Sequence, residues 1–218
     1  MDAARIKING SSYVGLFGIT NDKLCFVPES IEDRALKTIE QTLDVKAVKI
    51  SLYDSALISV FAKMNNTICV VPQILNSKEI EKIEREMKVK IIKTEQAIGN
   101  LIELNDTGAI VSKTAAKNIV EELKKEKLEV LQMNIGKTDA VGSAIVITNK
   151  GFVAGNETSE EEAKQISETL KITGGISTAN TGDSLIRNSV IANTKGFIAG
   201  ENTTGFELNR IDEALDGK

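Results

Sequence analysis

Two apolar runs separated by a polar turn recur five times along the chain. The turn begins with Asn in each copy, at positions 21, 65, 105, 149 and 193. Asn, Asp and Gly tolerate the backbone conformations of hairpin turns, so each pair of runs predicts a β-hairpin. The leading runs of the five hairpins cover residues 13–19, 56–61, 98–104, 144–147 and 185–192.

A segment with helical periodicity follows each hairpin. In the first, Ile31, Leu36, Ile39 and Leu43 fall on one face of a 3.6-residue helix. A hydroxyl residue suited to cap the helix precedes each segment: Ser30, Ser77, Thr114, Ser159 and Thr204. The last two caps are followed three residues later by Glu, which is the spacing of a capping box.

The spacing of the five Asn residues, which is 44, 40, 44 and 44, identifies an internal repeat of about 44 residues. Both Cys and both Pro of the chain also recur after 44 residues. We place the repeats at approximately 9–53, 54–94, 95–137, 138–181 and 182–218. No linker divides them, which predicts a single domain over residues 1–218.

The two ends of the chain complement each other. The first four helical segments are each followed by a short strand pattern, at residues 45–50, 89–92, 128–131 and 170–173. The fifth has none, whereas an unpaired strand pattern stands at residues 4–8. If this N-terminal strand joins the fifth repeat, the array closes and loses its exposed edges. The predicted fold is therefore α/β, a five-fold pseudosymmetric α/β propeller closed by the N-terminal strand.

Composition narrows the possible chemistry. The chain contains no His, which excludes Ser-His and Cys-His catalytic pairs and metal sites that use His. Cys25 and Cys69 lie inside apolar strand patterns and are interpreted as core residues. Gly136-Lys137-Thr138 is not a phosphate-binding loop, because Leu131 stands where that motif requires Gly. Gly174 and Gly175 are interpreted as a loop. We expect no catalytic residue, no metal and no cofactor.

The net charge indicates the class of partner, and the cysteine content indicates the cellular compartment. The net charge of −4 argues against binding nucleic acid mainly through its phosphates and favours a basic protein partner. No apolar run reaches the length of a membrane span, and no apolar leader is present. Two Cys in such a chain indicate a reducing compartment, so we expect a cytoplasmic location. At this point a generic ring-shaped scaffold for some other partner remains an alternative.

Three stretches of the chain resemble the translation initiation factor 6 family. They are residues 97–102 with 105–106, residues 141–143 with 149–151, and residues 178–182 with 193–208. The resemblance extends from end to end and agrees with the repeat order. The chain lacks the long C-terminal tail of eukaryotic members, from which we expect an archaeal source.

The resemblance implies a fold and a function. The fold is the pentein, five repeats around a pseudo-five-fold axis. The function is to bind the large (50S) ribosomal subunit on its intersubunit face and prevent premature association with the small subunit, in translation initiation and large-subunit biogenesis. Penteins also include guanidine-modifying enzymes that use Cys with His, and the lack of His excludes that chemistry here.

Partners follow from the same resemblance. The main contact is expected to be a ribosomal protein near the sarcin–ricin loop, with limited contact to rRNA. A release GTPase and a Shwachman–Bodian–Diamond-type protein are further expected partners. No membrane is involved, and the free protein is expected to be a monomer.

A ribosome-binding site on the rim of repeats two to four is implied as well. Six residues match it: Val60, Asn65, Asn66, Asn100, Ser143 and Ala144. Asn100 is the strongest candidate, with a turn or strand-edge role as its alternative. Ala144 replaces an aromatic residue common in eukaryotic members, and Val60 stands where those members carry a basic residue.

Overall fold

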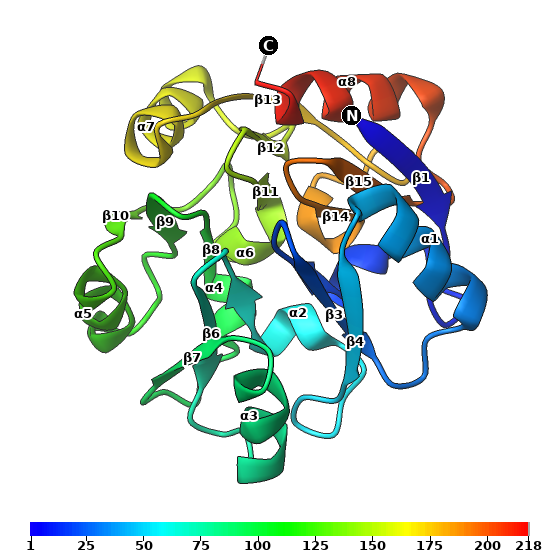
Figure 1. Cartoon of the computed structure of the whole chain (residues 1–218). Helices are drawn as coiled ribbons and strands as arrows, with labels where there is room; N and C mark the ends of the chain where they lie inside the picture. Colours follow the sequence, from blue (N-terminus) through cyan, green and yellow to red (C-terminus); the bar gives the residue numbers. More distant parts are fainter. Residues whose placement is uncertain (218) are drawn as a thin grey trace.

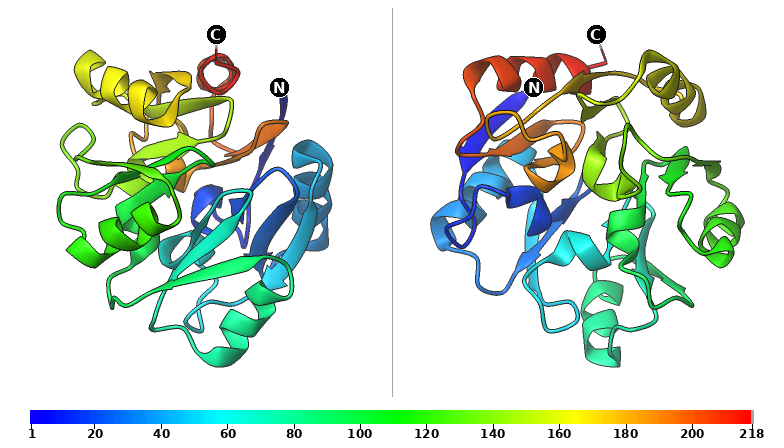
Figure 2. Two further views of the ribbon diagram at one scale, coloured as in Figure 1. Left: turned by 60° about the vertical axis from the view of Figure 1, so that its left-hand side comes forward. Right: turned by 180° about the vertical axis from the view of Figure 1, so that it is seen from behind.

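The computed structural model describes residues 1–217. In this range, five three-stranded sheets surround a central axis, and the five long helices lie on the outside of the ring (Figures 1 and 2). Each sheet has the same topology: an inner strand pairs antiparallel with the middle strand, and the outer strand pairs parallel with it. The α/β pentein fold predicted from the sequence is confirmed.

The strands of the five sheets are given in the order inner, middle, outer. They are β2 (Ile19–Thr20), β3 (Leu24–Pro28), β4 (Lys46–Ile50); β5 (Lys63–Met64), β6 (Ile68–Pro72), β7 (Lys88–Ile92); β8 (Ile102–Leu104), β9 (Gly108–Val111), β10 (Glu129–Gln132); β11 (Ile145–Ile147), β12 (Gly151–Gly155), β13 (Thr173–Ser177); and β14 (Val190–Ala192), β15 (Gly196–Gly200), β1 (Asp2–Ile6).

Helices are of two kinds. The long helices are α1 (Asp33–Leu43), α3 (Ser77–Glu84), α5 (Lys117–Lys125), α7 (Glu160–Leu170) and α8 (Gly205–Leu215). The short helical turns, one before each inner strand, are η1 (Val14–Leu16), α2 (Ile58–Phe61), α4 (Ile98–Leu101), α6 (Val141–Ala144) and η2 (Ile186–Asn188). No helix within residues 1–217 combines the length and apolar character that crossing a bilayer requires.

Strand β1 closes the ring. It pairs parallel with β15 from Asp2 opposite Gly196 to Ile6 opposite Gly200, which is the closure predicted from the missing fifth strand. The strand covers residues 2–6 rather than the predicted 4–8. It ends early because Asn9 and Gly10 adopt positive φ in a tight turn, and this turn pairs Ile8 with Ser11 instead of β15.

The hydrophobic core is divided into five clusters, each shared by two neighbouring sheets. In β3, Cys25 and Val27 pack in the cluster that reaches Ile191 and Ile198, whereas Leu24 and Phe26 face the next cluster around the ring. A strand that is buried on both faces needs apolar residues at every position. This explains why the middle strands are continuous apolar runs in the sequence.

Two of the five predicted helix caps are confirmed. Ser159 and Thr204 each accept a hydrogen bond from the backbone N–H of a Glu three residues on, and both form capping boxes. The predictions for Ser30, Ser77 and Thr114 are wrong, because the N-cap residues there are Glu32, Asn76 and Ala116. The Ser30 hydroxyl instead accepts a hydrogen bond from the Asn9 side chain, at 2.8 Å.

Two further segments differ from the sequence prediction. The leading apolar runs are strand only in part, because their first residues form the short helical turns. Gly174 and Gly175 lie in β13, not in a loop. A Cβ atom at Gly174 would lie 2.3 Å from the carbonyl oxygen of Phe152, so this strand requires Gly where it approaches β12.

Candidate functional site

The five short helical turns pack around the axis at one end of the inner strands; α2, α4 and α6 are at the centre of Figure 1. Their second residues lie against one another. A Cβ atom at Gly99 would lie 1.9 Å from the Ser59 carbonyl oxygen, and one at Gly142 would lie 1.9 Å from that of Gly99. The absence of side chains at these positions is therefore what allows the turns to close together.

The third residues of the five turns occupy equivalent places around this end. They are Leu16, Val60, Asn100, Ser143 and Asn188. Three of the six predicted binding residues, Val60, Asn100 and Ser143, are in this set. We call this end of the molecule, with the five short turns and the loops beside them, the short-helix face.

Asn100 is half-buried on the short-helix face. Its backbone N–H donates to the Ala97 carbonyl oxygen at 3.0 Å, as the third residue of a helical turn does. Within residues 1–217 its side chain makes no hydrogen bond, so the amide is available to a partner. Val60 is also half-buried, whereas Ser143 is 6% exposed.

Ala144 follows Ser143 and is buried. The equivalent residues of other repeats include Phe17 and Phe61, so a small residue here leaves space. A cavity of about 40 Å³ lies beside Ala144, between repeats four and five, and Thr158 also lines it. Among the described residues, the Thr158 hydroxyl is the buried side-chain polar atom without a hydrogen-bond partner. A cavity of this size accommodates an ordered water.

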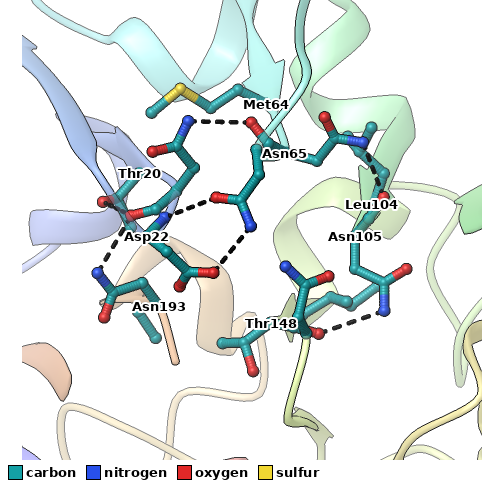
Figure 3. A pocket seen from close by; sticks show the side chains of 13 residues that line it. Thr20, Asp22, Met64, Asn65, Leu104, Asn105, Thr148 and Asn193 are labelled. Carbon is teal, nitrogen blue, oxygen red and sulfur yellow. Dashed lines mark hydrogen bonds between the residues drawn. The ribbon is translucent and has the colours of Figure 1, made fainter. Parts of the chain in front are cut away.

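Asn65 and Asn66 lie at the opposite end of the inner strands, where the hairpin turns meet around the axis (Figure 3). Asn21 Nδ2 donates to the Asn65 carbonyl oxygen at 3.0 Å, and Asn65 Nδ2 donates to that of Asn105 at 2.9 Å. Asn105 Nδ2 donates to the Thr148 carbonyl oxygen at 3.3 Å, and Asn193 Nδ2 donates to the Asn21 carbonyl oxygen at 3.1 Å. We call the five residues 21, 65, 105, 148 and 193 the asparagine collar.

Each collar side chain also shapes its own turn. Asn65 Oδ1 accepts hydrogen bonds from the backbone N–H groups two and three residues on, and the Oδ1 atoms of the other collar Asn residues do the same. In repeat four, Thr148 Oγ1 takes this role, so the structural equivalent is Thr148 and not Asn149. The Thr148 side chain has no amide group that could donate to the next repeat. The circle of side-chain amide hydrogen bonds is therefore interrupted between repeats four and five.

A second circle lies on the solvent side of the collar, and its members are Asp22, Asn66, Asp106, Asn149 and Thr194. Asn66 Nδ2 donates to Asp22 Oδ2 and to Asp106 Oδ2, at 2.8 Å in each case. Burial favours a raised pKa for Asp22, but hydrogen bonds from Thr194 and Asn66 outweigh burial and hold its pKa below the ordinary value. The opening between the two circles is about 20 Å³, which is room for about one water.

The six predicted residues therefore do not form one surface. Val60, Asn100 and Ser143 are on the short-helix face with Ala144 beneath it, whereas Asn65 and Asn66 are in the turns at the other end. The sequence showed which repeat each residue belongs to. It did not show which residues lie on the short-helix face and which lie at the opposite end, in the hairpin turns.

Three buried charges lie beneath the short-helix face, and the sequence interpretation did not identify them. Lys63 is 1% exposed; its Nζ lies 2.5 Å from Glu103 Oε2 and donates to the Gly142 carbonyl oxygen at 2.8 Å. Arg187 Nε lies 3.3 Å from the same Glu103 oxygen. Burial, together with the positive charge of Arg187, lowers the pKa of Lys63 to about 7 despite the Glu103 carboxylate.

The cysteines have the character expected of core residues. Both are fully buried, and burial raises the pKa of Cys25 and of Cys69 to about 12. At neutral pH both are therefore thiols rather than nucleophilic thiolates. Within residues 1–217 no three acidic or cysteine side chains are grouped so as to hold a metal ion.

Comparison with known proteins gives a consistent family. The sequence model described as "eIF-6 family" matches residues 3–214. Translation initiation factor 6 of Pyrococcus horikoshii is 33% identical over 191 residues, which cover 84% of this chain and 84% of the relative. The protein of the same name from Picrophilus torridus is 31% identical over 188 residues, covering 85% and 87%.

Solved structures give more distant matches. The chain resembles an agmatine deiminase from C. jejuni with a TM-score of 0.47 and 17% identity, over 76% of this chain and 64% of the other. It resembles DDAH from Pseudomonas aeruginosa with a TM-score of 0.46 and 10% identity, over 95% of this chain and 75% of the other.

Proposed function

The chain belongs to the eIF-6 family, and from this premise we propose that it binds the large ribosomal subunit and prevents premature association with the small subunit. Relatives named translation initiation factor 6 support a role in translation initiation. The binding would be to the intersubunit face of the large subunit, where a bound body of this size excludes the small subunit sterically. A role in large-subunit biogenesis and a cytoplasmic location accompany this proposal.

The state of the Asn100 side chain supports the short-helix face as the surface that contacts the ribosome. On the short-helix face, the Asn100 side-chain amide has no hydrogen-bond partner among the described residues 1–217, and it lies next to the equivalent residues Val60 and Ser143 of the neighbouring turns. A half-buried amide held on a rigid turn gains hydrogen bonds to a partner at little cost in conformational entropy. We therefore assign the contact to the short-helix face of repeats two to four, with Asn100 at its centre.

Asn65 and Asn66 take a different part in this proposal. The Asn65 backbone carbonyl oxygen and Nδ2 are already hydrogen-bonded to the neighbouring turns, and its Oδ1 accepts from the N–H groups of its own turn. Asn66 joins two carboxylates of adjacent repeats. Their role is to hold the ring together, and the rim of repeats two to four that contacts the ribosome is the end that carries Asn100.

The partner is proposed to be mainly a ribosomal protein near the sarcin–ricin loop, with limited rRNA contact. The acidic net charge supports a protein over a phosphate backbone. Release by a GTPase with a Shwachman–Bodian–Diamond-type protein, and a monomeric free state, belong to the same proposal. The protein would act by occlusion and not by catalysis, which the lack of His and the protonated, buried thiols support.

Asn100→Arg tests this function. The added side chain is too large for a closed contact, so we expect co-sedimentation with isolated large subunits to fall at least about tenfold. The melting temperature should stay nearly unchanged, because the Asn100 side chain makes no hydrogen bond within the part of the chain that the structure describes. The measurement is sedimentation of purified protein with large and small subunits separately, together with an assay of subunit joining.

Asn209→Arg is the matched control, since Asn209 is exposed on α8 and, among residues 1–217, its side chain is hydrogen-bonded only to Glu213 on the same helix. This variant should sediment with large subunits as the wild type does. Wild-type protein that sediments with neither subunit would refute the function. Normal binding by Asn100→Arg would refute the assignment of Asn100.

A further inference from the structure

The turn that leads into α2 has an unusual residue. Leu52 pairs with Ser55 across Tyr53 and Asp54, which adopt φ of 54° and 51°. The equivalent turns of repeats one, four and five begin with Asn9, Gly136 and Asn180, also at positive φ. Asn and Gly tolerate this left-handed conformation, but it is strained for a bulky residue such as Tyr. Backbone strain of this kind is concentrated at functional sites.

The strained turn places the Tyr53 ring outside the core. The side chain is 57% exposed, and its ring packs on Phe61 of α2 with a centroid distance of 5.4 Å. Phe61 directly follows Val60, so the pair of rings extends the short-helix face outward on repeat two. Tyr53 therefore adds aromatic surface at the margin of the proposed contact.

Repeat one continues the same surface. Tyr13, which precedes η1, is 48% exposed, and η1 packs against α2. Leu16 is half-buried at the position that Val60 occupies in repeat two. We call Tyr13, Leu16, Tyr53, Val60 and Phe61 the aromatic patch. In repeats three and four the third turn residue is polar, so this surface does not follow the five-fold symmetry.

A carboxylate borders the aromatic patch. Asp54 is exposed beside Tyr53, and its backbone N–H donates to Glu79. An apolar centre with an acidic margin complements a protein segment that carries an apolar side chain between Lys or Arg. The same margin repels nucleic-acid phosphates, although aromatic rings alone are able to stack on bases.

We propose that the aromatic patch binds a basic protein segment of the large subunit, which seats an apolar side chain against Tyr53 and Phe61. This inference rests on the proposed function and extends its contact from repeats two to four onto repeat one. Tyr53 is then an anchor whose ring is held outward at the expense of local backbone strain.

Tyr53→Asn separates the anchor from the fold. Asn suits the positive φ of this turn, so the melting temperature should equal or exceed that of the wild type. Loss of the ring should weaken co-sedimentation with large subunits about tenfold or more. Phe206→Asn is the matched control, because Phe206 is an aromatic residue of α8 outside the patch and is 71% exposed. It should leave binding unchanged.

The outcomes are distinct. If the wild type sediments with large subunits and Tyr53→Asn sediments equally well, the patch proposal is overturned and the proposed function stands. If the wild type itself does not bind, both are overturned. A photo-crosslinking phenylalanine derivative at position 53 identifies the partner class. Adducts to a basic ribosomal protein support the proposal, whereas adducts to rRNA alone overturn it.

Discussion

Arg187 reaches more of the ring than its place in the chain suggests. Its guanidinium donates to the carbonyl oxygens of Gly15 and Gly18 in repeat one and of Val190 in repeat five, at 2.8 to 3.0 Å. Through Glu103 it connects to Lys63, so the three charges link all five repeats beneath the short-helix face. A buried charge is tolerated only with such partners, and losing one partner leaves the others uncompensated.

Lys63 gives the protein a specific pH dependence. Its pKa is lowered from the ordinary 10.5 to about 7, so above pH 7 the unfolded chain binds more protons at this residue than the folded chain. The free energy of unfolding should therefore rise with pH between about 7 and 10.5. Urea denaturation at pH 7, 8 and 8.5 should show a steeper rise for the wild type than for Lys63→Met.

The urea denaturation experiments stay below pH 9 because, above that pH, the two buried thiols lower the free energy of unfolding, whereas Lys63 raises it. The raised pKa of Cys25 and Cys69 keeps them protonated in the folded state, so stability falls once unfolded thiols ionise. In Lys63→Met, Glu103 keeps its contact with Arg187, which limits the damage to the cluster. Equal pH slopes for the two proteins would contradict this account of Lys63.

Long helices begin at the short-helix end of the sheets, and their first turns are secured individually. In α8, Thr204 Oγ1 accepts from the Glu207 backbone N–H at 3.2 Å, and Glu207 Oε2 accepts from the Thr204 N–H at 2.8 Å. Glu207 also accepts from the N–H of Gly182, in the loop before η2. One carboxylate thus fixes both the start of α8 and a loop of the short-helix face.

Removal of this cap should be measurable. Thr204→Ala loses the side-chain half of the capping box, so we expect a destabilisation of about 1 kcal/mol by urea denaturation. Ser30→Ala is the informative comparison, because Ser30 resembles a cap in the sequence but does not cap α1. Its effect should stay within about 0.5 kcal/mol. A larger loss for Ser30→Ala than for Thr204→Ala would contradict the assigned caps.

Closure of the ring depends on β1, the short strand at the N-terminus. The five residues of β1 complete the fifth sheet, and the Met1 amino group pairs with Asp212 of α8 at 2.7 Å. The N-terminus therefore lies beside α8, as Figure 1 shows. Without β1, the long edge of β15 would be unpaired and α1 would lose one of the strands that it packs against.

Deletion of residues 1–6 should lower the melting temperature strongly and cause association through the free edge of β15. A peptide with the sequence of residues 1–8, added in excess, should restore part of the lost stability by mass action. A scrambled peptide of the same composition is the control. A truncated protein that melts like the wild type would show that β1 is dispensable for closure.

The number of repeats, the α/β class and the closure of the ring could all be predicted from local sequence patterns. The patterns are the Asn turns, the continuous apolar runs of strands buried on both faces, and the strand that the fifth repeat lacks and the N-terminus supplies. The capping boxes at Ser159 and Thr204 were also predictable, because they involve only residues three apart.

The distribution of the candidate residues over the two ends of the molecule depends on tertiary contacts and was not predictable from the sequence. Asn65 and Asn100 look alike in the sequence, but the Asn65 amide is hydrogen-bonded in the collar, whereas the Asn100 amide on the short-helix face has no partner within residues 1–217. The single-residue shift at Thr148 and the Lys63–Glu103–Arg187 cluster depend on contacts 40 or more residues apart. Such contacts leave no local periodicity, because the groups meet only when the ring has closed.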